Sequence, residues 1–226
     1  KRQPRNFHAS VRLADGRVLI IGGQNRQDPG FPQLLSVTDA EIFDPATNTF
    51  TPTGSTNVAR SVAAAVLLPD GRVLLAGGQT AQGDGTGVAL NSMEIYNPAT
   101  GVFTLLPTTL NGPRTAHRAV SLSDGRVLIV GGIRDATAAI FDPATNTLSP
   151  AGNMSFDRMN TTLVRLSDGR VAAIGGLSEL DNDTSNGLEI TDTVEIFDPA
   201  TNAFTLVGNT MSTTRHTAGA VQLLDG

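Results

Sequence analysis

The sequence predicts an all-β chain built from a repeated unit of four short strands. Three observations lead to this prediction: Asp-Gly dipeptides recur along the chain, a Gly-Gly pair follows each of the first four, and a Pro-Ala-Thr turn follows each Gly-Gly pair. No stretch shows the apolar period of an amphipathic helix, so we expect only strands and turns. Internal repeats of this length are typical of stacked or radial architectures.

An arginine precedes each Asp-Gly by ten residues and marks the start of each repeat. These arginines are Arg5, Arg60, Arg114, Arg158 and Arg215. They divide the chain into repeats at 5–59, 60–113, 114–157 and 158–214, with a partial repeat at 215–226. We expect residues 1–226 to form one domain, since a single all-β barrel or propeller often has this length.

The first two strands of each repeat are predicted to form a β-hairpin. In the second repeat, the small and apolar segment 60–68 leads into Asp70-Gly71 and then into the apolar run 72–76. Asp-Gly between apolar runs is the strongest short hairpin signal, and we expect a type I′ turn with positive φ at both central residues. The Gly-Gly pair at the end of strand two predicts a close backbone approach or an unusual φ.

Strands three and four are predicted to form a second hairpin. In the fourth repeat, segment 194–197 leads into the turn at 198–202, which has Pro at its second position and an Asn able to adopt left-handed φ. A lone four-stranded sheet cannot bury both faces, so the units must pack on one another, and radial packing gives a β-propeller. The expected core consists of strand-two residues and turn aromatics: Val18, Leu19, Ile20, Val73, Leu74, Val127, Leu128, Ile129, Val171, Phe43, Phe141 and Phe197.

At these residues the chain resembles the kelch family. The pattern R..H..V.L.DGRVL..GG, followed by EIFDPATN.F, recurs through essentially the whole chain. The resemblance implies a kelch-type β-propeller, and the repeats are similar to those of bacterial kelch proteins and of galactose-oxidase-like enzymes. In the third repeat Ala139 replaces the usual Glu, so one polar contact between strands is expected to be missing there.

The strands do not add up to a closed ring. The chain has five copies of strand one but only four of each other strand, whereas kelch rings usually close by pairing strands from opposite ends of the chain. We therefore expect four four-stranded blades plus the first strand of a fifth, as part of a larger ring of about six or seven blades. The alternative is a closed four-bladed ring, which leaves one strand without a position.

Composition disfavours several classes of function. The formal net charge is −5 and Lys1 is the only lysine, which disfavours a nucleic-acid interface. The absence of cysteine removes disulfides, thiolate metal sites and cysteine nucleophiles. No apolar run approaches the roughly 18 residues that cross a bilayer, and no signal peptide is visible in the sequence. We expect no cofactor and a bacterial, secreted protein located outside the cell or in the periplasm.

The five repeat arginines form the first candidate site. The resemblance to kelch proteins implies that they lie near the mouth of the central channel, where a ring of guanidinium groups would face an acidic ligand. In the structural alternative, each planar guanidinium group bonds backbone carbonyls or a carboxylate. Strict repetition favours the structural alternative, because a ligand site is more often asymmetric.

The connections between strands two and three form the second candidate site. Repeat proteins place recognition in variable loops on a rigid frame. Segments 24–37, 79–91 and 177–191 differ in length and sequence, whereas 133–138 is too short to reach far. We expect the three long segments to be irregular and to form one continuous surface. Apolar anchor residues are expected in the first of them: Phe31, Leu34 and Leu35.

A calcium site is a weaker possibility in the third of these segments. Asp181, Asp183 and Ser185 offer oxygen ligands at alternate positions, as at the start of a calcium-binding loop. The following glycine comes one position late and no flanking helices are expected, so a solvated acidic loop is favoured.

The sequence as a whole favours a non-catalytic binding or scaffolding module. A protein is the favoured partner, a glycan is the second option, and self-association is expected if the ring is incomplete. An aromatic content of 4% without Trp weakens the glycan option. The alternative is the propeller portion of a galactose-oxidase-like copper-radical oxidase with its catalytic residues outside this chain. That family's chemistry needs a tyrosine cross-linked to a cysteine, and this chain has no Cys and one tyrosine, Tyr96.

Overall fold

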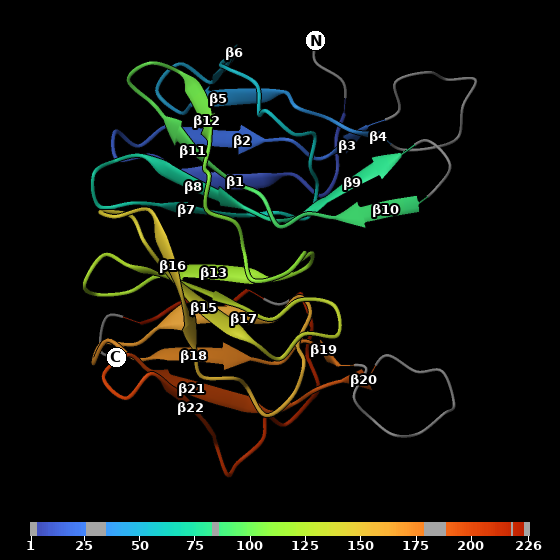
Figure 1. The fold of residues 1–226 in the computed structure, drawn as a ribbon, viewed down its shortest axis with the longest axis vertical. Helices are drawn as coiled ribbons and strands as arrows, with labels where there is room; N and C mark the ends of the chain where they lie inside the picture. The colour runs from blue at the N-terminus through green and yellow to red at the C-terminus, as the bar shows by residue number, and fades with distance from the viewer. Residues whose placement is uncertain (1–3, 26–34, 83–85, 179–188, 218, 224–226) are drawn as a thin grey trace. The chain divides into compact units, whose positions relative to one another are not determined.

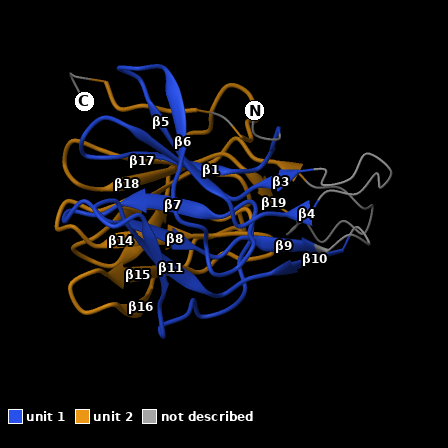
Figure 2. Cartoon of the chain, turned by 90° about the horizontal axis from the view of Figure 1, so that it is seen from above, with its two compact units in different colours: residues 1–115 blue, residues 116–226 orange. Residues whose placement is uncertain are grey.

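The computed structural model describes residues 4–25, 35–82, 86–178, 189–217 and 219–223, in which every regular element is a β-strand (Figure 1). The all-β class is therefore confirmed. The chain divides into two compact units, residues 1–115 and 116–226 (Figure 2). Each unit contains two four-stranded sheets, one per repeat. No helix in the described part of the chain is long and apolar enough to span a membrane.

Each repeat forms one antiparallel sheet whose strands pair in chain order. The first two sheets contain β1 (Ala9–Arg12), β2 (Val18–Ile21), β5 (Ala40–Asp44) and β6 (Thr49–Pro52), and then β7 (Ala64–Leu67), β8 (Val73–Ala76), β11 (Met93–Asn97) and β12 (Val102–Leu105). The last two contain β13 (Arg118–Ser121), β14 (Val127–Val130), β15 (Ala138–Asp142) and β16 (Thr147–Ala151), and then β17 (Thr162–Arg165), β18 (Val171–Ile174), β21 (Val194–Asp198) and β22 (Ala203–Leu206).

The sequence predicts that the three long connections between strands two and three are irregular, and this prediction is wrong for their ends. In each connection the first and last residues pair with each other as a short two-stranded ribbon. The ribbon forms because these residues leave neighbouring antiparallel strands and continue their pairing. The ribbons are β3 (Gln24–Asn25) with β4 (Leu35–Ser36), β9 (Gln79–Gln82) with β10 (Thr86–Ala89), and β19 (Leu177–Ser178) with β20 (Glu189–Ile190).

The Asp-Gly hairpin turn is not the expected type I′ turn. Gly16 has φ of 90°, but Asp15 is not among the residues with positive φ. The Gly16 N–H donates to the Leu13 carbonyl at 3.0 Å, which makes a type I turn followed by a left-handed glycine. The Asp15 carboxylate accepts hydrogen bonds from the Arg17 backbone N–H at 3.0 Å and from Arg17 Nε at 2.8 Å. The aspartate therefore stabilises the turn through its side chain rather than through its backbone conformation.

The turn between strands three and four has the predicted conformation. Asn48, Asn146 and Asn202 have φ of 55°, 55° and 57°, and Gly101 takes the same position in the second repeat with φ of 71°. Asn and Gly are the residues that adopt left-handed φ at low cost, which explains why each repeat has one of them at this point.

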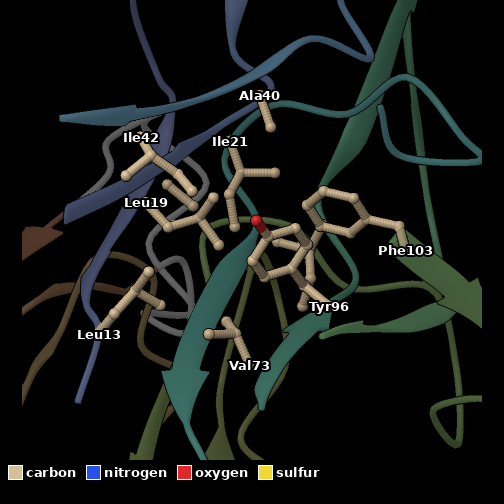
Figure 3. Close-up of a cluster of buried hydrophobic side chains, with 10 residues drawn as sticks. Leu13, Leu19, Ile21, Ala40, Ile42, Val73, Tyr96 and Phe103 are labelled. Atoms are coloured by element: carbon tan, nitrogen blue, oxygen red, sulfur yellow. The ribbon is translucent and has the colours of Figure 1, made fainter. Parts of the chain in front are cut away.

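Most of the expected core residues are buried, but three are not. Val18, Ile20 and Phe43 are only partly buried. They share one face of the first sheet, since Val18 pairs with Phe43 in the register of β2 and β5. The opposite face carries Leu19, which packs with Val73 and Tyr96 of the second sheet (Figure 3). Within unit 1 only that inner face is covered by another sheet, so the outer residues keep part of their exposure.

Candidate functional site

Each four-stranded sheet has two ends with different composition. The turn end carries the Asp-Gly and Pro-Ala-Thr turns, which are nearly identical in all repeats. The loop end carries the end of strand two, the start of strand three and the link that enters strand one. The ribbons extend from the loop end, as β3–β4 and β9–β10 do in unit 1 (Figure 1). Variation between repeats is therefore concentrated at the loop end.

Arg60 lies at the loop end of the second sheet and is almost fully buried. Its Nη1 donates to the Gly77 carbonyl at 2.8 Å and to the Ser92 carbonyl at 3.1 Å. Its Nη2 lies 2.6 Å from Glu94 Oε1, and the two side chains are 1% and 0% exposed. Burial lowers the pKa of the Arg60 guanidinium, and the charge of Glu94 opposes that effect. The arginine thus joins the end of strand two to the start of strand three.

The fourth repeat reproduces this arrangement in unit 2. Arg158 Nη1 donates to the Gly175 carbonyl at 3.0 Å and to the Thr193 carbonyl at 3.2 Å. Its Nη2 lies 3.0 Å from Glu195 Oε1, with both side chains at 0% exposure. The same contacts in two sheets favour the structural role that strict repetition suggested.

The remaining repeat arginines differ in exposure. Arg5 pairs with Glu41 at 2.9 Å and also donates to two backbone carbonyls, while Arg114 is buried. Arg215 is exposed. A ring of ligand-facing guanidinium groups is therefore not formed by Arg5, Arg60 and Arg158, because carboxylates and carbonyls of their own repeats already accept their hydrogen bonds.

The repeat glutamates also hold the link from the preceding repeat. Glu94 Oε2 accepts hydrogen bonds from the Asn57 backbone N–H at 2.8 Å and from Asn57 Nδ2 at 2.9 Å. In unit 2, Glu195 Oε2 accepts one from the Ser155 backbone N–H at 2.7 Å. Each carboxylate therefore bonds an arginine of its own repeat and a backbone group of the one before.

Each Gly-Gly pair lies against the backbone of the arginine that begins the next repeat, which confirms the predicted close backbone approach. The Gly23 N–H donates to the Arg60 carbonyl at 2.9 Å. A Cβ on Gly22 would lie 2.3 Å from the same carbonyl oxygen, which no side chain tolerates. The equivalent bonds join Gly78 to Arg114 at 2.8 Å, Gly132 to Arg158 at 3.1 Å and Gly176 to Arg215 at 2.8 Å.

A second close backbone approach involves left-handed residues that the sequence did not reveal. Two residues after each arginine the backbone adopts φ between 50° and 58°, although the residues there are as different as Phe7, Val62, Ala116, Asn160 and Thr217. In unit 1 the Val62 N–H donates to the Phe7 carbonyl at 2.9 Å. Positive φ is a genuine outlier for a β-branched residue such as Val62, so hydrogen bonds between sheets must hold it there.

Two ribbons of unit 1 are joined by a buried polar network. Ser36 Oγ on β4 accepts a hydrogen bond from the Ala81 N–H on β9 at 2.8 Å and lies 3.3 Å from the Gln79 carbonyl. Gln24 Nε2 donates to Ser61 Oγ at 3.0 Å beneath them. The first two ribbons therefore lie side by side. Residues 86–88 of β10 are exposed.

Several expected site residues lie outside the described part of the chain. They are Phe31 and Leu34 of the apolar anchor and Asp181, Asp183 and Ser185 of the calcium candidate. Leu35 lies on β4 and is partly buried. In the described ranges, no group of three or more His, Asp or Glu side chains is arranged to hold a metal ion.

The comparisons with known proteins agree with this architecture. The Kelch motif matches residues 5–57 and 60–109. The solved structure of YjhT superposes with a TM-score of 0.68 over 93% of this chain and 67% of YjhT, at 16% sequence identity. Kelch repeats therefore occupy the first half of the chain, and the fold of the whole chain is that of a kelch propeller. At such low identity the likeness to YjhT concerns the kelch fold alone.

Two relatives share kelch sequence with part of the chain. Spermatocyte protein spe-26 of Caenorhabditis elegans is 35% identical over 131 residues, which are 58% of this chain and 21% of spe-26. A galactose oxidase of Gibberella zeae is 43% identical over 77 residues, which are 33% of this chain and 11% of that enzyme. The matched kelch segment is thus a small fraction of both relatives.

One loop-end residue breaks the symmetry of the kelch repeats. Four residues after the repeat arginine, three repeats have the small residues Ala9, Ala64 and Thr162, whereas the third has Arg118. Arg118 begins β13 and is partly buried. Its Nη1 donates to the His117 carbonyl at 3.1 Å and its Nη2 to Asn160 Oδ1 at 3.3 Å. Arg118 is not one of the repeated arginines, and its signal in the sequence is a charged residue at a repeat position that is otherwise small.

Proposed function

We propose that this kelch propeller is a non-catalytic module that binds a protein partner through the loop ends of its sheets. The observation that carries the proposal is the contrast between the two ends of each sheet. The Arg–Glu pairs and Gly-Gly pairs recur from repeat to repeat, whereas the ribbons at the loop end differ in length and sequence. Only the variable part of such a frame distinguishes one partner from another.

A protein surface matches the exposed groups better than a glycan does. Residues 86–88 on β10 are exposed, and Val88 is 52% exposed. An exposed β-branched apolar side chain is suited to contact with another protein. Sugars favour aromatic faces, and the chain has no Trp and buries its one tyrosine, Tyr96, which leaves phenylalanines such as Phe7 as its exposed aromatic residues.

Loop replacement tests the proposal. Partners are first identified by cross-linking and mass spectrometry in cells that make the protein, and the affinity of each purified partner is then measured. Replacing residues 24–37 with the short segment 133–138 should leave the unfolding transition cooperative and abolish binding. The matched control is Thr145→Lys, which changes an exposed residue at the turn end. Partner binding that survives the replacement, or cross-links concentrated at the turn end, would refute the proposal.

The match to galactose oxidase supports a second candidate, the propeller portion of a copper-radical oxidase. In this chain Tyr96 has a structural environment: its hydroxyl lies 2.7 Å from Thr53 Oγ1, and its ring packs on Phe103 with centroids 4.6 Å apart. Residues outside this chain would therefore have to supply the copper ligands and the radical. Metal analysis of the parent protein distinguishes the candidates, since stoichiometric copper together with oxidase activity would favour the enzyme.

A further inference from the structure

The Arg118 guanidinium has hydrogen-bonding capacity that the described residues do not use. Of the five N–H groups of an arginine side chain, one on Nη1 and one on Nη2 are occupied by the His117 carbonyl and Asn160 Oδ1. In the described part of the chain, the Nε–H and one further N–H on each Nη have no acceptor. These three donors form the planar fork that binds a carboxylate through two parallel hydrogen bonds.

None of the described carboxylates serves as a counterion for Arg118, and burial alone lowers its pKa. Arg60 and Arg158 are buried as well, but each has a glutamate within 3.0 Å. A partly buried cation without an anion is costly, and an anionic group that binds beside it relieves that cost.

The neighbours of Arg118 hold its side chain in place. Asn160, which follows the arginine of the next repeat by two positions, has φ of 53°. Its backbone N–H donates to the Ala116 carbonyl at 2.8 Å, which fixes the backbone that carries the Asn160 side chain. An arginine already oriented by such a contact loses little conformational entropy when it binds a ligand.

We propose that Arg118 is an anchor for a carboxylate group in an acidic peptide segment of the protein partner. This inference rests on the proposed binding function and names the chemistry of its partner. Arg118 begins β13 at the loop end of the third sheet, the same end of the repeat from which the ribbons extend. A nucleic acid does not fit, because a single cation on a chain of net charge −5 does not neutralise a polyanion.

The test uses two acetylated tetrapeptides, Gly-Glu-Glu-Gly amide and Gly-Gln-Gln-Gly amide, and the full chain labelled with ¹⁵N. The side-chain Nε–Hε resonance of Arg118 is assigned by its loss in Arg118→Ala. We expect the Glu peptide to shift this resonance in a saturable manner and the Gln peptide to leave it unchanged. Arg118→Ala should raise the dissociation constant of the Glu peptide about tenfold or more, since it removes a bidentate ionic contact.

The control variants separate this role from a structural one. Arg118→Ala introduces the residue type found at Ala9 and Ala64, so the fold should persist, and Arg118→Gln serves if it does not. Arg165→Ala removes an exposed arginine from β17 and should leave the dissociation constant unchanged within about twofold. Equal affinity of wild type and Arg118→Ala for the Glu peptide would overturn the anchor.

Two further outcomes are decisive. If inorganic phosphate shifts the Arg118 resonance as strongly as the Glu peptide does, the site binds anions in general and the peptide assignment is wrong. If replacement of residues 24–37 abolishes partner binding while Arg118→Ala leaves both partner and peptide affinity unchanged, the proposed function stands and the anchor fails.

Discussion

The Arg60 guanidinium lies 2.6 Å from the Glu94 carboxylate, and the two side chains are 1% and 0% exposed. The Asp70–Arg72 pair of the same repeat has the same separation, but its side chains are 47% and 33% exposed. Distance alone therefore does not distinguish the two pairs; burial does. A buried pair from which one partner is removed leaves an uncompensated charge, whereas an exposed pair is solvated by water.

Removal of the Arg60 side chain should destabilise the protein strongly. In Arg60→Ala, Glu94 loses its counterion and the Gly77 and Ser92 carbonyls lose a donor. We expect a loss of about 3–5 kcal/mol in the free energy of unfolding, measured by urea denaturation. Arg72→Ala, the exposed control, should cost about 0–1 kcal/mol. Equal losses in the two variants would show that the buried pair has no special structural role.

Substitution by alanine should destabilise the protein more at Gly22 than at Gly71, although both glycines have left-handed φ. Gly22 has φ of 60° and a Cβ there would lie 2.3 Å from the Arg60 carbonyl oxygen, whereas Gly71 has φ of 85° and nothing within 4 Å. Gly71→Ala should cost about 1–2 kcal/mol because of its backbone conformation alone. Gly22→Ala should cost about 1–3 kcal/mol more, since it also forces two sheets apart. Chemical denaturation of both variants measures the difference, and indistinguishable stabilities would contradict the close backbone approach at Gly22.

The Phe141 side chain should contribute more to the free energy of unfolding than the Phe50 side chain. Phe141 is fully buried, while Phe50 is 59% exposed and packs on Phe43 with ring centroids 4.8 Å apart. Phe141→Ala should lower the free energy of unfolding by about 3–5 kcal/mol, because it leaves a cavity between packed strands. Phe50→Ala should cost about 1 kcal/mol. A loss below about 1 kcal/mol for Phe141→Ala would place this aromatic at the periphery.

The Asp-Gly-Arg turns predict a dependence of stability on pH. A side-chain hydrogen bond from Arg126 holds the pKa of Asp124 below its ordinary value of 3.8, and Arg17 has the same effect on Asp15. Since the folded-state pKa is depressed, this contribution is fully present above the unfolded-state pKa and is lost as the pH falls through the folded-state value. The combined variant Asp15→Asn and Asp124→Asn should therefore lose less stability than wild type between about pH 5 and 3.

Urea denaturation at a series of pH values measures this difference. The Asn side chain keeps an oxygen that accepts the backbone hydrogen bond of the turn, so the substitution removes mainly the titrating charge. Parallel stability curves for the variant and the wild type would show that the turn carboxylates do not contribute to the pH dependence.

Part of the local structure followed directly from residue types. The Asn at position 202 and its equivalents adopt the left-handed conformation that their chemistry favours, and the Gly-Gly pairs approach backbone as expected. The Asp-Gly dipeptide predicts a type I′ turn, which is wrong for this protein. Asp15 stabilises the turn through its carboxylate, and only Gly16 of the two residues has positive φ. A dipeptide motif thus identified the hairpin without specifying which groups stabilise it.

The position of Val62 shows the opposite case. Nothing in its residue type predicts φ of 53°, and β-branched residues disfavour that conformation. Its N–H bonds the Phe7 carbonyl of the preceding repeat, 55 positions earlier in the chain. The conformation therefore arises from packing between sheets, which local propensities do not encode.

The sequence by itself determined the order of the four sheet strands in each repeat, the resemblance to kelch proteins and the identity of the variable connections, because these depend on residue spacing and local turn chemistry. Only the tertiary structure decided that three connections begin and end in paired strands, which charges are buried, which face of the first sheet is covered and which arginine has no carboxylate partner among the described residues. Arg60 and Arg118 have the same chemistry and both are withdrawn from water, but Arg60 meets a glutamate from its own sheet and Arg118 meets a carbonyl and an amide. The packing of the sheets decides how far each guanidinium group is withdrawn from water and which residues accept its hydrogen bonds. Residue type alone does not decide this, because the accepting residues can be distant in the sequence.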